Sequence, residues 1–485
     1  MSTAAQTHGP VSARPPALVI TVLGFCGIVV ALMQTLIVPL VPILPRILHA
    51  SPANASWAIT ATLLSGAVVT PIAGRLGDMF GKRRILLISL AALIVGSVIC
   101  ALGTTLIPVV VGRVLQGAAT GVIPLGISIM RDELPAERVG SAMAIMSATL
   151  GVGGAIGMPV AAVIAEKADW HTLFWVSGGL GVLSLLVVIT LIPESSVTSR
   201  GSFDYLGAVG LSAALVALLL AITKGNDWGW SSDLTLGLLA ASVVLLVLWG
   251  AYELRRTQPL VDLRVSARRQ VLFTNLASVA VGFAMYGMSL IPSQILMAPK
   301  ATGYGMGLSM VQAGLMLTPS GLAMFALSPM SARISARSGP RTSLLTGALV
   351  IMVGYILTLV LRDNPAELMV AMIVVGGGIG IAYAAMPALI MSSVPLHETA
   401  AANGLNSLMR AVGTSLSAAA ISVVLAARTM SLGPAKVPAG SGFTIAIWIT
   451  IVACALTIGL TLLIPCRASE AAPVLVEAES EPVAG

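Results

Sequence analysis

Residues 74–84 read Gly74-Arg-Leu-Gly-Asp78-Met-Phe-Gly81-Lys82-Arg83-Arg84, and they separate two apolar stretches, 56–74 and 84–103. An apolar stretch of about 20 residues is long enough to cross about 30 Å of hydrocarbon as a helix. Glycine permits tight turns and close helix approach, and basic residues beside a span are typical of its cytoplasmic side. The stretch therefore predicts a short cytoplasmic turn between two membrane-spanning helices.

The composition of the whole chain is that of an integral membrane protein. Of 485 residues, 57% are hydrophobic and 9% are charged, and the mean hydropathy is +0.99. A soluble domain carries about 25% charged residues. Strands of a membrane β-barrel would alternate apolar and polar residues in segments of about ten, and the sequence has no such alternation. We therefore expect an all-α integral membrane protein.

Fourteen apolar segments of spanning length follow one another along the chain. We do not expect the first to be a signal peptide, because its apolar stretch is too long and has no basic flank beyond Arg14. An even number of spans would put both termini on the same side. The predicted spans are 17–43, 56–74, 84–103, 105–130, 140–165, 172–192, 205–223, 234–252, 271–298, 308–331, 342–361, 366–391, 400–427 and 442–465.

Loop charges indicate the orientation, because cytoplasmic loops carry an excess of Lys and Arg. The two tails and every second loop hold 17 of the 26 basic residues, and the opposite loops hold seven. We therefore expect both termini to be cytoplasmic, and the net charge of +7 to reflect this bias without a nucleic-acid partner. The seventeen are Arg14, Arg75, Lys82, Arg83, Arg84, Arg131, Arg138, Arg200, Arg255, Arg256, Arg264, Arg268, Arg269, Arg333, Arg337, Arg341 and Arg467.

The two remaining basic residues, Arg113 and Arg410, fall inside predicted spans. Arg113 has no Lys, Asp or Glu within seventeen residues on either side. A charge inside a span costs about 2.5 kcal/mol or more unless it faces protein or water, so by default it marks a transport pathway. All 19 Asp and Glu residues fall in loops, tails or span ends, so we expect no carboxylate near the membrane midplane.

An internal repeat appears at an offset of about 260 residues. Residues 124–135 align with 384–395, and Gly74 and Gly81 align with Ala332 and Gly339. The repeat predicts two six-helix bundles, 17–197 and 269–466, joined by a linker with two extra helices, 198–268. Outside the bundles we expect a cytoplasmic N-terminal tail (1–16) and a disordered acidic cytoplasmic tail (467–485). In the second half, Ala336 stands at the position of Asp78 and Ile373 at that of Arg113.

These motifs resemble those of a known transporter family. Residues 74–84 resemble the loop motif of the major facilitator superfamily, and Arg113-Val-Leu-Gln116-Gly117 resembles its span 4 motif. Residues 203–207, 228–230 and 253–264 resemble the linker of the fourteen-span drug:proton antiporter branch, which exports multiple drugs or secondary metabolites. The resemblance covers nearly the whole chain. It implies the major facilitator fold, with two six-helix bundles and a two-helix central insert.

The resemblance also implies a cytoplasmic gate that locks the two halves in the outward-facing state. The carboxylate of Asp78 can accept from a neighbouring helix N-terminus and pair with Lys82, and Asp132 or Glu133 can pair with the basic cluster. For Arg83 and Arg84, a role as topology anchors is the alternative. The predicted gate residues are Gly74, Asp78, Gly81, Lys82 and Asp132.

Two departures from the branch bear on proton antiport. In span 5 the proline of the helix-bending motif, Pro159 after Gly157, comes one residue late, although we still expect a kink there. Gln34 replaces the usual span 1 aspartate. The predicted proton-coupling residues are therefore Asp132 or Glu133, with Arg113 as the responding charge and Asp78 behind them.

In the superfamily, the first and fourth helices of each half line the substrate cavity, here spans 1, 4, 9 and 12. Each polar residue in these spans could instead make an ordinary helix–helix hydrogen bond. Because the spans hold no carboxylate partner for a cation, we expect neutral or anionic amphipathic substrates. For Arg410 both a helix seam and the cavity stay open. The predicted cavity residues are Gln34, Thr35, Arg113, Gln116, Asn275, Tyr286, Gln294 and Tyr383.

Together these features predict a secondary active transporter that exports drugs or secondary metabolites across a bacterial inner membrane, with protons as the coupling partner. Uptake or lipid translocation on the same fold is the alternative. An integral-membrane enzyme is disfavoured because the four histidines are far apart in sequence and no phosphate loop or nucleophile motif occurs. We expect no cofactor or metal, since Cys26, Cys100, Cys454 and Cys466 are too scattered for a cluster and suit apolar packing. The oligomeric state stays open, and a monomer would suffice.

Overall fold

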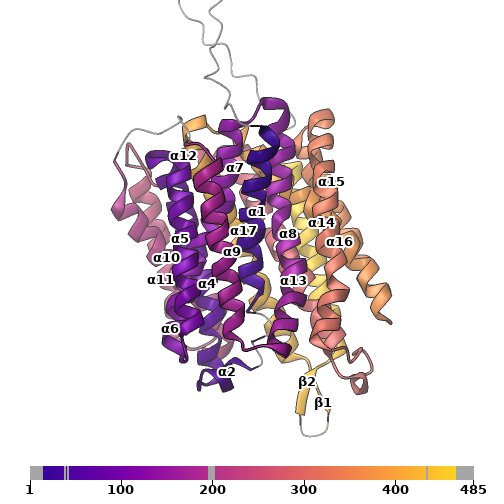
Figure 1. Ribbon diagram of the computed structural model, residues 1–485. Coiled ribbons are helices and arrows are strands. Elements are labelled where there is room, and N and C mark those ends of the chain that lie inside the picture. Colours follow the sequence, from indigo (N-terminus) through magenta and orange to yellow (C-terminus); the bar gives the residue numbers. More distant parts are fainter. Residues whose placement is uncertain (1–14, 38–39, 41–42, 195–201, 433–434, 466–485) are drawn as a thin grey trace, which may run out of the picture.

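The computed structural model describes residues 15–37, 40, 43–194, 202–432 and 435–465. Within them it contains 14 helices that are long and apolar enough to cross a membrane, which confirms the predicted number. Most of the N-terminal tail, the whole acidic C-terminal tail and Cys466 lie outside the described residues. Figure 1 shows the spanning helices running side by side in one bundle.

The first six spans form the N-terminal half. Its fourth span is broken in the middle by one turn of 3-10 helix, where the sequence predicts a single helix. The spanning helices are α1 (Pro16–Thr35), α4 (Trp57–Phe80), α5 (Lys82–Leu102), α6–η2–α7 (Leu106–Gly117, Ala118–Gly121, Val122–Glu133), α8 (Ala136–Lys167) and α9 (His171–Leu191), with the short helices α2 (Leu44–Ile47) and α3 (Pro52–Ala55) between α1 and α4.

The predicted end of the first span was wrong. The sequence predicts a span over 17–43, but α1 ends at Thr35. Pro39, Pro42 and Pro45 follow at intervals of three residues. Proline has no backbone N–H and clashes with the preceding turn, which favours the end of α1 before this stretch.

The insert and the second half complete the chain. The expectation of a purely helical protein needs a small correction, because an antiparallel two-stranded hairpin, β1 (Thr429–Leu432) and β2 (Ala435–Pro438), connects the last two spans at one end of the bundle (Figure 1). The helices are α10 (Tyr205–Trp228), α11 (Asp233–Glu253), α12 (Leu263–Ser266), α13 (Arg269–Met297), η3 (Lys300–Thr302), α14 (Met310–Ser338), α15 (Pro340–Val360), α16 (Pro365–Met391), η4 (Leu396–Glu398), α17 (Thr399–Ala427) and α18 (Gly440–Leu462).

The two halves turn at equivalent glycines. Gly81 separates α4 from α5 with a φ of 104°, and Gly339 separates α14 from α15 with a φ of 84°. Both values lie in the left-handed region that favours glycine. This shared backbone geometry matches the alignment of Gly81 with Gly339 in the sequence repeat.

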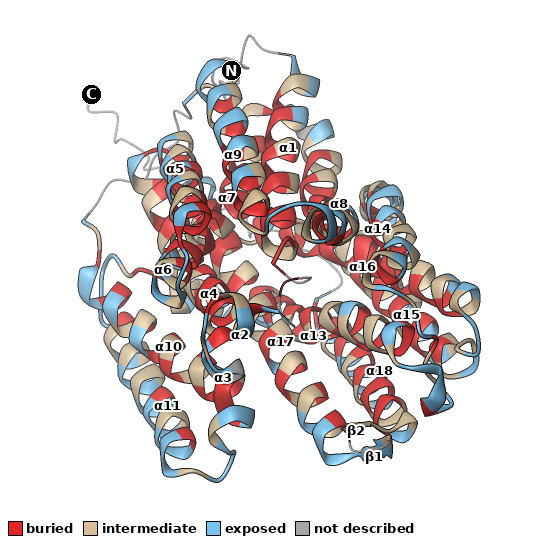
Figure 2. Ribbon diagram, turned by 60° about the horizontal axis from the view of Figure 1, so that its bottom comes forward, coloured by how far each residue is buried: buried red, intermediate tan, exposed pale blue. Residues whose placement is uncertain are grey.

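The halves meet most extensively along two pairs of spanning helices, α4 with α17 and α8 with α14, and α16 with α8 and α17 with α7 are also in contact. The backbones approach closely there, since a Cβ atom on Gly74 would overlap the Ala400 carbonyl and one on Gly321 would overlap the Gly151 carbonyl. The insert helix α10 packs against both α4 and α17. Buried residues gather on the inward faces of the helices, while α11 lies at the edge with an exposed apolar surface suited to lipid (Figure 2).

Candidate functional site

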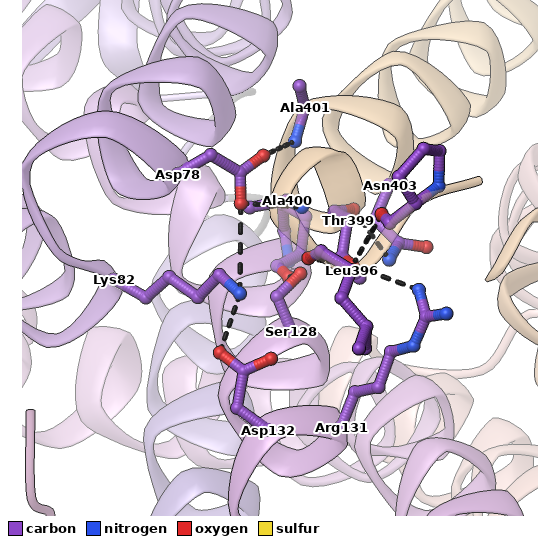
Figure 3. A network of polar contacts seen from close by, with 12 residues as sticks. Asp78, Lys82, Ser128, Arg131, Asp132, Leu396, Thr399, Ala400, Ala401 and Asn403 are labelled. Atoms are coloured by element: carbon purple, nitrogen blue, oxygen red, sulfur yellow. Dashed lines mark hydrogen bonds and ion pairs between the residues drawn. The ribbon is translucent and has the colours of Figure 1, made fainter. Parts of the chain in front are cut away.

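The first candidate site joins the two halves at the end of the bundle where α4 ends and α17 begins. Asp78, in the last turn of α4, accepts hydrogen bonds from the backbone N–H groups of Ala400 and Ala401, at 3.2 and 2.9 Å (Figure 3). These donors belong to the first turn of α17, where intrahelical acceptors are missing and the helix dipole favours a negative charge. One carboxylate therefore links the first half to the second.

Lys82 connects this carboxylate to a second one. Its Nζ lies 2.6 Å from Asp132 Oδ2 and 3.7 Å from Asp78 Oδ1. The exposed fractions of the Lys82, Asp78 and Asp132 side chains are 0%, 0% and 2%. Two carboxylates and one ammonium thus share a dry environment, and the positive end of the α17 dipole offsets their surplus negative charge.

Tight packing surrounds this group of charges. Gly74 lies against the Ala400 backbone, and Gly81 supports the turn between α4 and α5. The structure therefore brings all five predicted gate residues together, and Glu133 ends helix α7 beside Asp132. Arg83 donates to the Ile189 carbonyl of α9 at 2.7 Å, a contact within the first half.

Arg131 makes a second link between the halves, which the sequence analysis missed. Its guanidinium donates to Thr399 Oγ1 at 2.9 Å and to the backbone carbonyls of Met391 and Val394 at 3.0 and 3.4 Å. Thr399 begins α17 (Figure 3), Met391 ends α16, and Val394 lies between the two helices. The sequence offered only one signal, the position of Arg131 directly before Asp132 and Glu133.

Among the described residues, polar links between the two halves gather at this end of the bundle. Five hydrogen bonds cross between the halves here, two accepted by Asp78 and three donated by Arg131. Another crosses from Thr318 of α14 to the Ala155 carbonyl of α8, at 3.0 Å. The structure is therefore closed at the end that carries Asp78.

Arg113 lies in the first half and is bonded to neighbouring helices. Its Nε donates to the Ala58 carbonyl of α4 at 2.9 Å, and its Nη1 donates to Gln116 Oε1 at 2.8 Å and lies 3.5 Å from the Met33 carbonyl of α1. Gln116 in turn donates to Ser97 of α5 at 2.8 Å. With 2% of its surface exposed, Arg113 ties together the helices of its own half.

Arg410 is a buried arginine of the second half, with 7% of its surface exposed, although it is not at the position equivalent to Arg113. It donates to Asn406 Oδ1 and, at 2.7 Å, to Ser407 Oγ, both one turn earlier on α17. Its guanidinium carbon lies 5.1 Å from the centre of the Tyr383 ring on α16. Asn406 also donates to Asn275 Oδ1 of α13 at 3.0 Å. Two predicted cavity residues, Asn275 and Tyr383, are thus joined in one cluster around Arg410.

The other predicted cavity residues stay apart from these clusters. Thr35 donates to carbonyls of Leu32 and Gly153, at 3.0 and 3.4 Å, which is a helix-packing contact. Gln34, Tyr286 and Gln294 are half-buried, and their side chains make no hydrogen bond within the described part of the chain. Their place in a cavity remains a prediction.

The glycine and proline stretch of α8 lies at a helix crossing. A Cβ atom on Gly157 would overlap Thr35 of α1, and Gly314 of α14 faces Pro159. The stretch therefore lets α1 and α14 approach α8 closely. The kink predicted at Pro159 remains a prediction. In the described ranges, no group of His, Cys, Asp and Glu could hold a metal ion, and Cys26, Cys100 and Cys454 are buried thiols.

The family model of the Major Facilitator Superfamily matches residues 23–418. The chain belongs to this superfamily. The solved structure of the human organic anion transporter MFSD10 (TETRAN) has a similar fold, with a TM-score of 0.66. The match covers 93% of this chain and 100% of that one, at 15% sequence identity. The predicted fold, two six-helix bundles with a two-helix insert, is thereby confirmed.

Curated relatives of this superfamily member include bacterial resistance proteins. The Tetracenomycin C resistance and export protein of Streptomyces glaucescens is 28% identical over 88% of this chain and 80% of its own length. Multidrug resistance protein 3 of Bacillus subtilis is 25% identical over 74% of this chain and 70% of its own length. An uncharacterized MFS-type transporter of Mycobacterium tuberculosis is 27% identical over 86% of this chain, and the chain spans 61% of that relative's length.

Proposed function

We propose that this protein is a secondary active transporter that exports amphipathic small molecules, drugs or secondary metabolites, from the cytoplasm of a bacterium in exchange for protons. The observation that carries the proposal is the buried link from Asp78 and Lys82 to the first turn of α17. A link of this kind closes one end of the protein and can open again. The names of the relatives from Streptomyces and Bacillus support export and resistance.

The orientation of the protein follows from its basic loops. The closed end carries Lys82, Arg83 and Arg84, so we assign it to the cytoplasm, together with both termini. The described conformation is then outward-facing. The membrane is the bacterial plasma membrane.

Proton coupling is assigned to the closed end. Asp132 and Glu133 would take up a proton at the cytoplasmic mouth, and Arg113 would respond to the change of charge. Protonation of a carboxylate in this group would weaken its pairing with Lys82 and the α17 dipole, and so favour opening. Proton binding and closure of the gate would then exclude each other.

The proposal also includes a substrate preference. Away from the span ends, the arginines Arg113 and Arg410 are buried, and the sequence places no carboxylate near the midplane. A lipophilic cation would find no buried counter-charge, whereas a neutral or anionic compound would meet less electrostatic resistance. We therefore assign neutral or anionic amphipathic substrates.

Flux into everted membrane vesicles tests the proposal. The probes are ethidium, 1-pyrenebutyrate and its methyl ester, which are cationic, anionic and neutral. We expect vesicles with an acidic interior to accumulate the anion or the ester, and a protonophore to abolish this accumulation. Loss of preloaded probe from the vesicles would favour the uptake alternative. Accumulation of ethidium alone would contradict the substrate preference, and flux indifferent to the gradient would contradict proton antiport.

A further inference from the structure

The cluster around Arg410 contains a buried charge without a protein counter-charge. Arg410 forms no ion pair with any described residue, and the nearest ring, Tyr383, supplies only its π face. An arginine side chain stays protonated inside proteins, so Arg410 cannot lower the cost of its burial by becoming neutral. Burial of an unpaired charge is unfavourable, which points to a partner from outside the chain.

The hydrogen bonds of the cluster identify the chemistry of that partner. Asn406 uses its amide fully, because its nitrogen donates to Asn275 and Ser278 and its oxygen accepts from Arg410. Ser407 Oγ accepts from Arg410 as well. The acceptors of Asn275, Asn406 and Ser407 thus already receive hydrogen bonds from donors of the cluster, and only the Tyr383 hydroxyl could still accept one.

What the cluster still offers is mainly donors. A guanidinium has five N–H groups, and only two of its nitrogens donate here, one to Asn406 and one to Ser407. The amide nitrogen of Asn275 and the hydroxyl of Tyr383 donate to no described residue. A partner for this cluster must therefore accept hydrogen bonds, and it must be negatively charged to neutralise Arg410.

The position of the cluster fits a substrate site. Asn275 lies on α13 and Tyr383 on α16, the first and fourth helices of the second half. Arg410 is eleven residues beyond Thr399, which is about 16 Å along α17 from the closed end. That distance is about half of a hydrocarbon core of about 30 Å.

We propose that Arg410, Tyr383 and Asn275 form a subsite that binds the carboxylate or phenolate oxygen of an amphipathic organic anion. The planar guanidinium matches a carboxylate with two parallel N–H···O bonds. Tyr383 holds the guanidinium from its face, and Asn406 holds it from its own helix. This inference rests on the proposed export function, because it assigns the substrate's anionic group to residues of the transport path.

Binding to the purified full-length protein in lipid nanodiscs tests the subsite without requiring transport. The fluorescent probes are 1-pyrenebutyrate and its methyl ester, which share the apolar part and differ in the charge. We expect wild-type protein to bind the acid about tenfold more tightly than the ester, as suits a charge-assisted pair of hydrogen bonds. Arg410→Gln should remove this preference and leave ester binding unchanged. Arg269→Gln, an exposed arginine of the same half, is the matched control and should keep it.

A second variant covers the case in which Arg410→Gln does not fold. Tyr383→Phe keeps the ring against Arg410 and removes only the hydroxyl, so acid binding should weaken by about threefold with ester binding unchanged. Equal binding of acid and ester by the wild type, or equal weakening of both by Tyr383→Phe, would overturn the proposal. Loss of acid binding in millimolar inorganic phosphate would also overturn it, because the site would then serve a simple anion.

The binding assay in nanodiscs and the flux assay in vesicles distinguish a failure of the proposed subsite from a failure of the proposed export function. If the nanodisc protein prefers the acid in an Arg410-dependent way but vesicles show no gradient-driven flux, the subsite stands and the export function fails. If vesicles export the ester and acid alike through wild type and Arg410→Gln, export stands and the subsite fails.

Discussion

The two membrane-embedded arginines differ in where their hydrogen-bond acceptors come from. Arg113 donates to the Ala58 carbonyl on α4, lies beside the Met33 carbonyl on α1, and so fastens helices of the first half to one another. Arg410 donates hydrogen bonds only to Asn406 and Ser407 on its own helix, and it contacts the neighbouring helix α16 through the face of the Tyr383 ring. Both guanidiniums keep unused N–H groups, but Arg113 donates to another helix of its own half, whereas the hydrogen bonds of Arg410 stay on its own helix.

The same asymmetry separates the two halves as wholes. They share a duplicated scaffold, with the glycine turns at Gly81 and Gly339 in equivalent places. Yet the first half carries the locking carboxylate Asp78, where the second has Ala336. The repeated fold thus supplies two similar helix bundles, while we assign the lock to the first half and anion recognition to the second.

Asp78→Asn should have the largest effect. The amide cannot carry the charge that pairs with Lys82 and the N-terminus of α17, so we expect transport in vesicles to fall by at least about a hundredfold with normal membrane insertion. Ala336→Asn, the equivalent position in the second half, is the matched control and should transport normally. Wild-type flux through a well-expressed Asp78→Asn variant would refute the one-sided lock.

Arg113→Ala should reduce the amount of folded protein and abolish proton-coupled flux in the protein that remains. Removing the guanidinium leaves buried carbonyls of Ala58 and Met33 without their donor, at about 1–3 kcal/mol for each unsatisfied group. Yield after detergent extraction and size-exclusion chromatography is the measurement, and we expect a loss of severalfold. Normal proton-coupled flux in the folded variant would contradict the coupling role assigned to Arg113, and full yield would contradict its role in holding the helices together.

Arg131→Gln should shift the protein toward conformations open at the Asp78 end. The variant loses the charge that holds the carbonyls of Met391 and Val394, while the Asp78 link remains. Spin labels at Glu137→Cys and Leu396→Cys, in a background without native cysteines, would report the distance between the halves. We expect a larger population of long distances, whereas the exposed control Arg84→Gln should match the parent.

Ser407→Ala should produce the smallest change. It removes one acceptor of the Arg410 guanidinium, so the guanidinium is less firmly oriented but keeps its charge. We expect pyrenebutyrate binding to weaken by about twofold, with ester binding unchanged. A loss as large as that of Arg410→Gln would mean that the orientation of the guanidinium, rather than its charge, determines recognition.

Much of the fold could be predicted because its signals are local. Apolar length marks each span, and the stretch from Gly74 to Arg84 places Asp78 and Lys82 four residues apart, close enough to pair across one helix end. Composition could not reveal the early end of α1, because the first predicted span counted its prolines as apolar filler. The hairpin at Thr429–Pro438 is a short loop feature without a span-length signal.

The parts of the candidate site that escaped prediction depend on long-range packing. Arg131 contacts residues about 260 positions away in the sequence. The cluster of Asn275, Tyr383 and Arg410 draws its members from three helices, and nothing in their local sequence couples them. Arg113 and Arg410 look alike in the sequence, and only the positions of their acceptors distinguish them.

The ratio of acid affinity to ester affinity, measured in nanodiscs for Arg410→Gln and Arg113→Gln side by side, tests the contrast between the two arginines most directly. Both substitutions remove one buried positive charge, so a general effect of positive potential would change both ratios alike. We predict that the preference for 1-pyrenebutyrate over its methyl ester, about tenfold in the wild type, disappears in Arg410→Gln and persists in folded Arg113→Gln. Loss of the preference in Arg113→Gln, or its persistence in Arg410→Gln, would contradict the account.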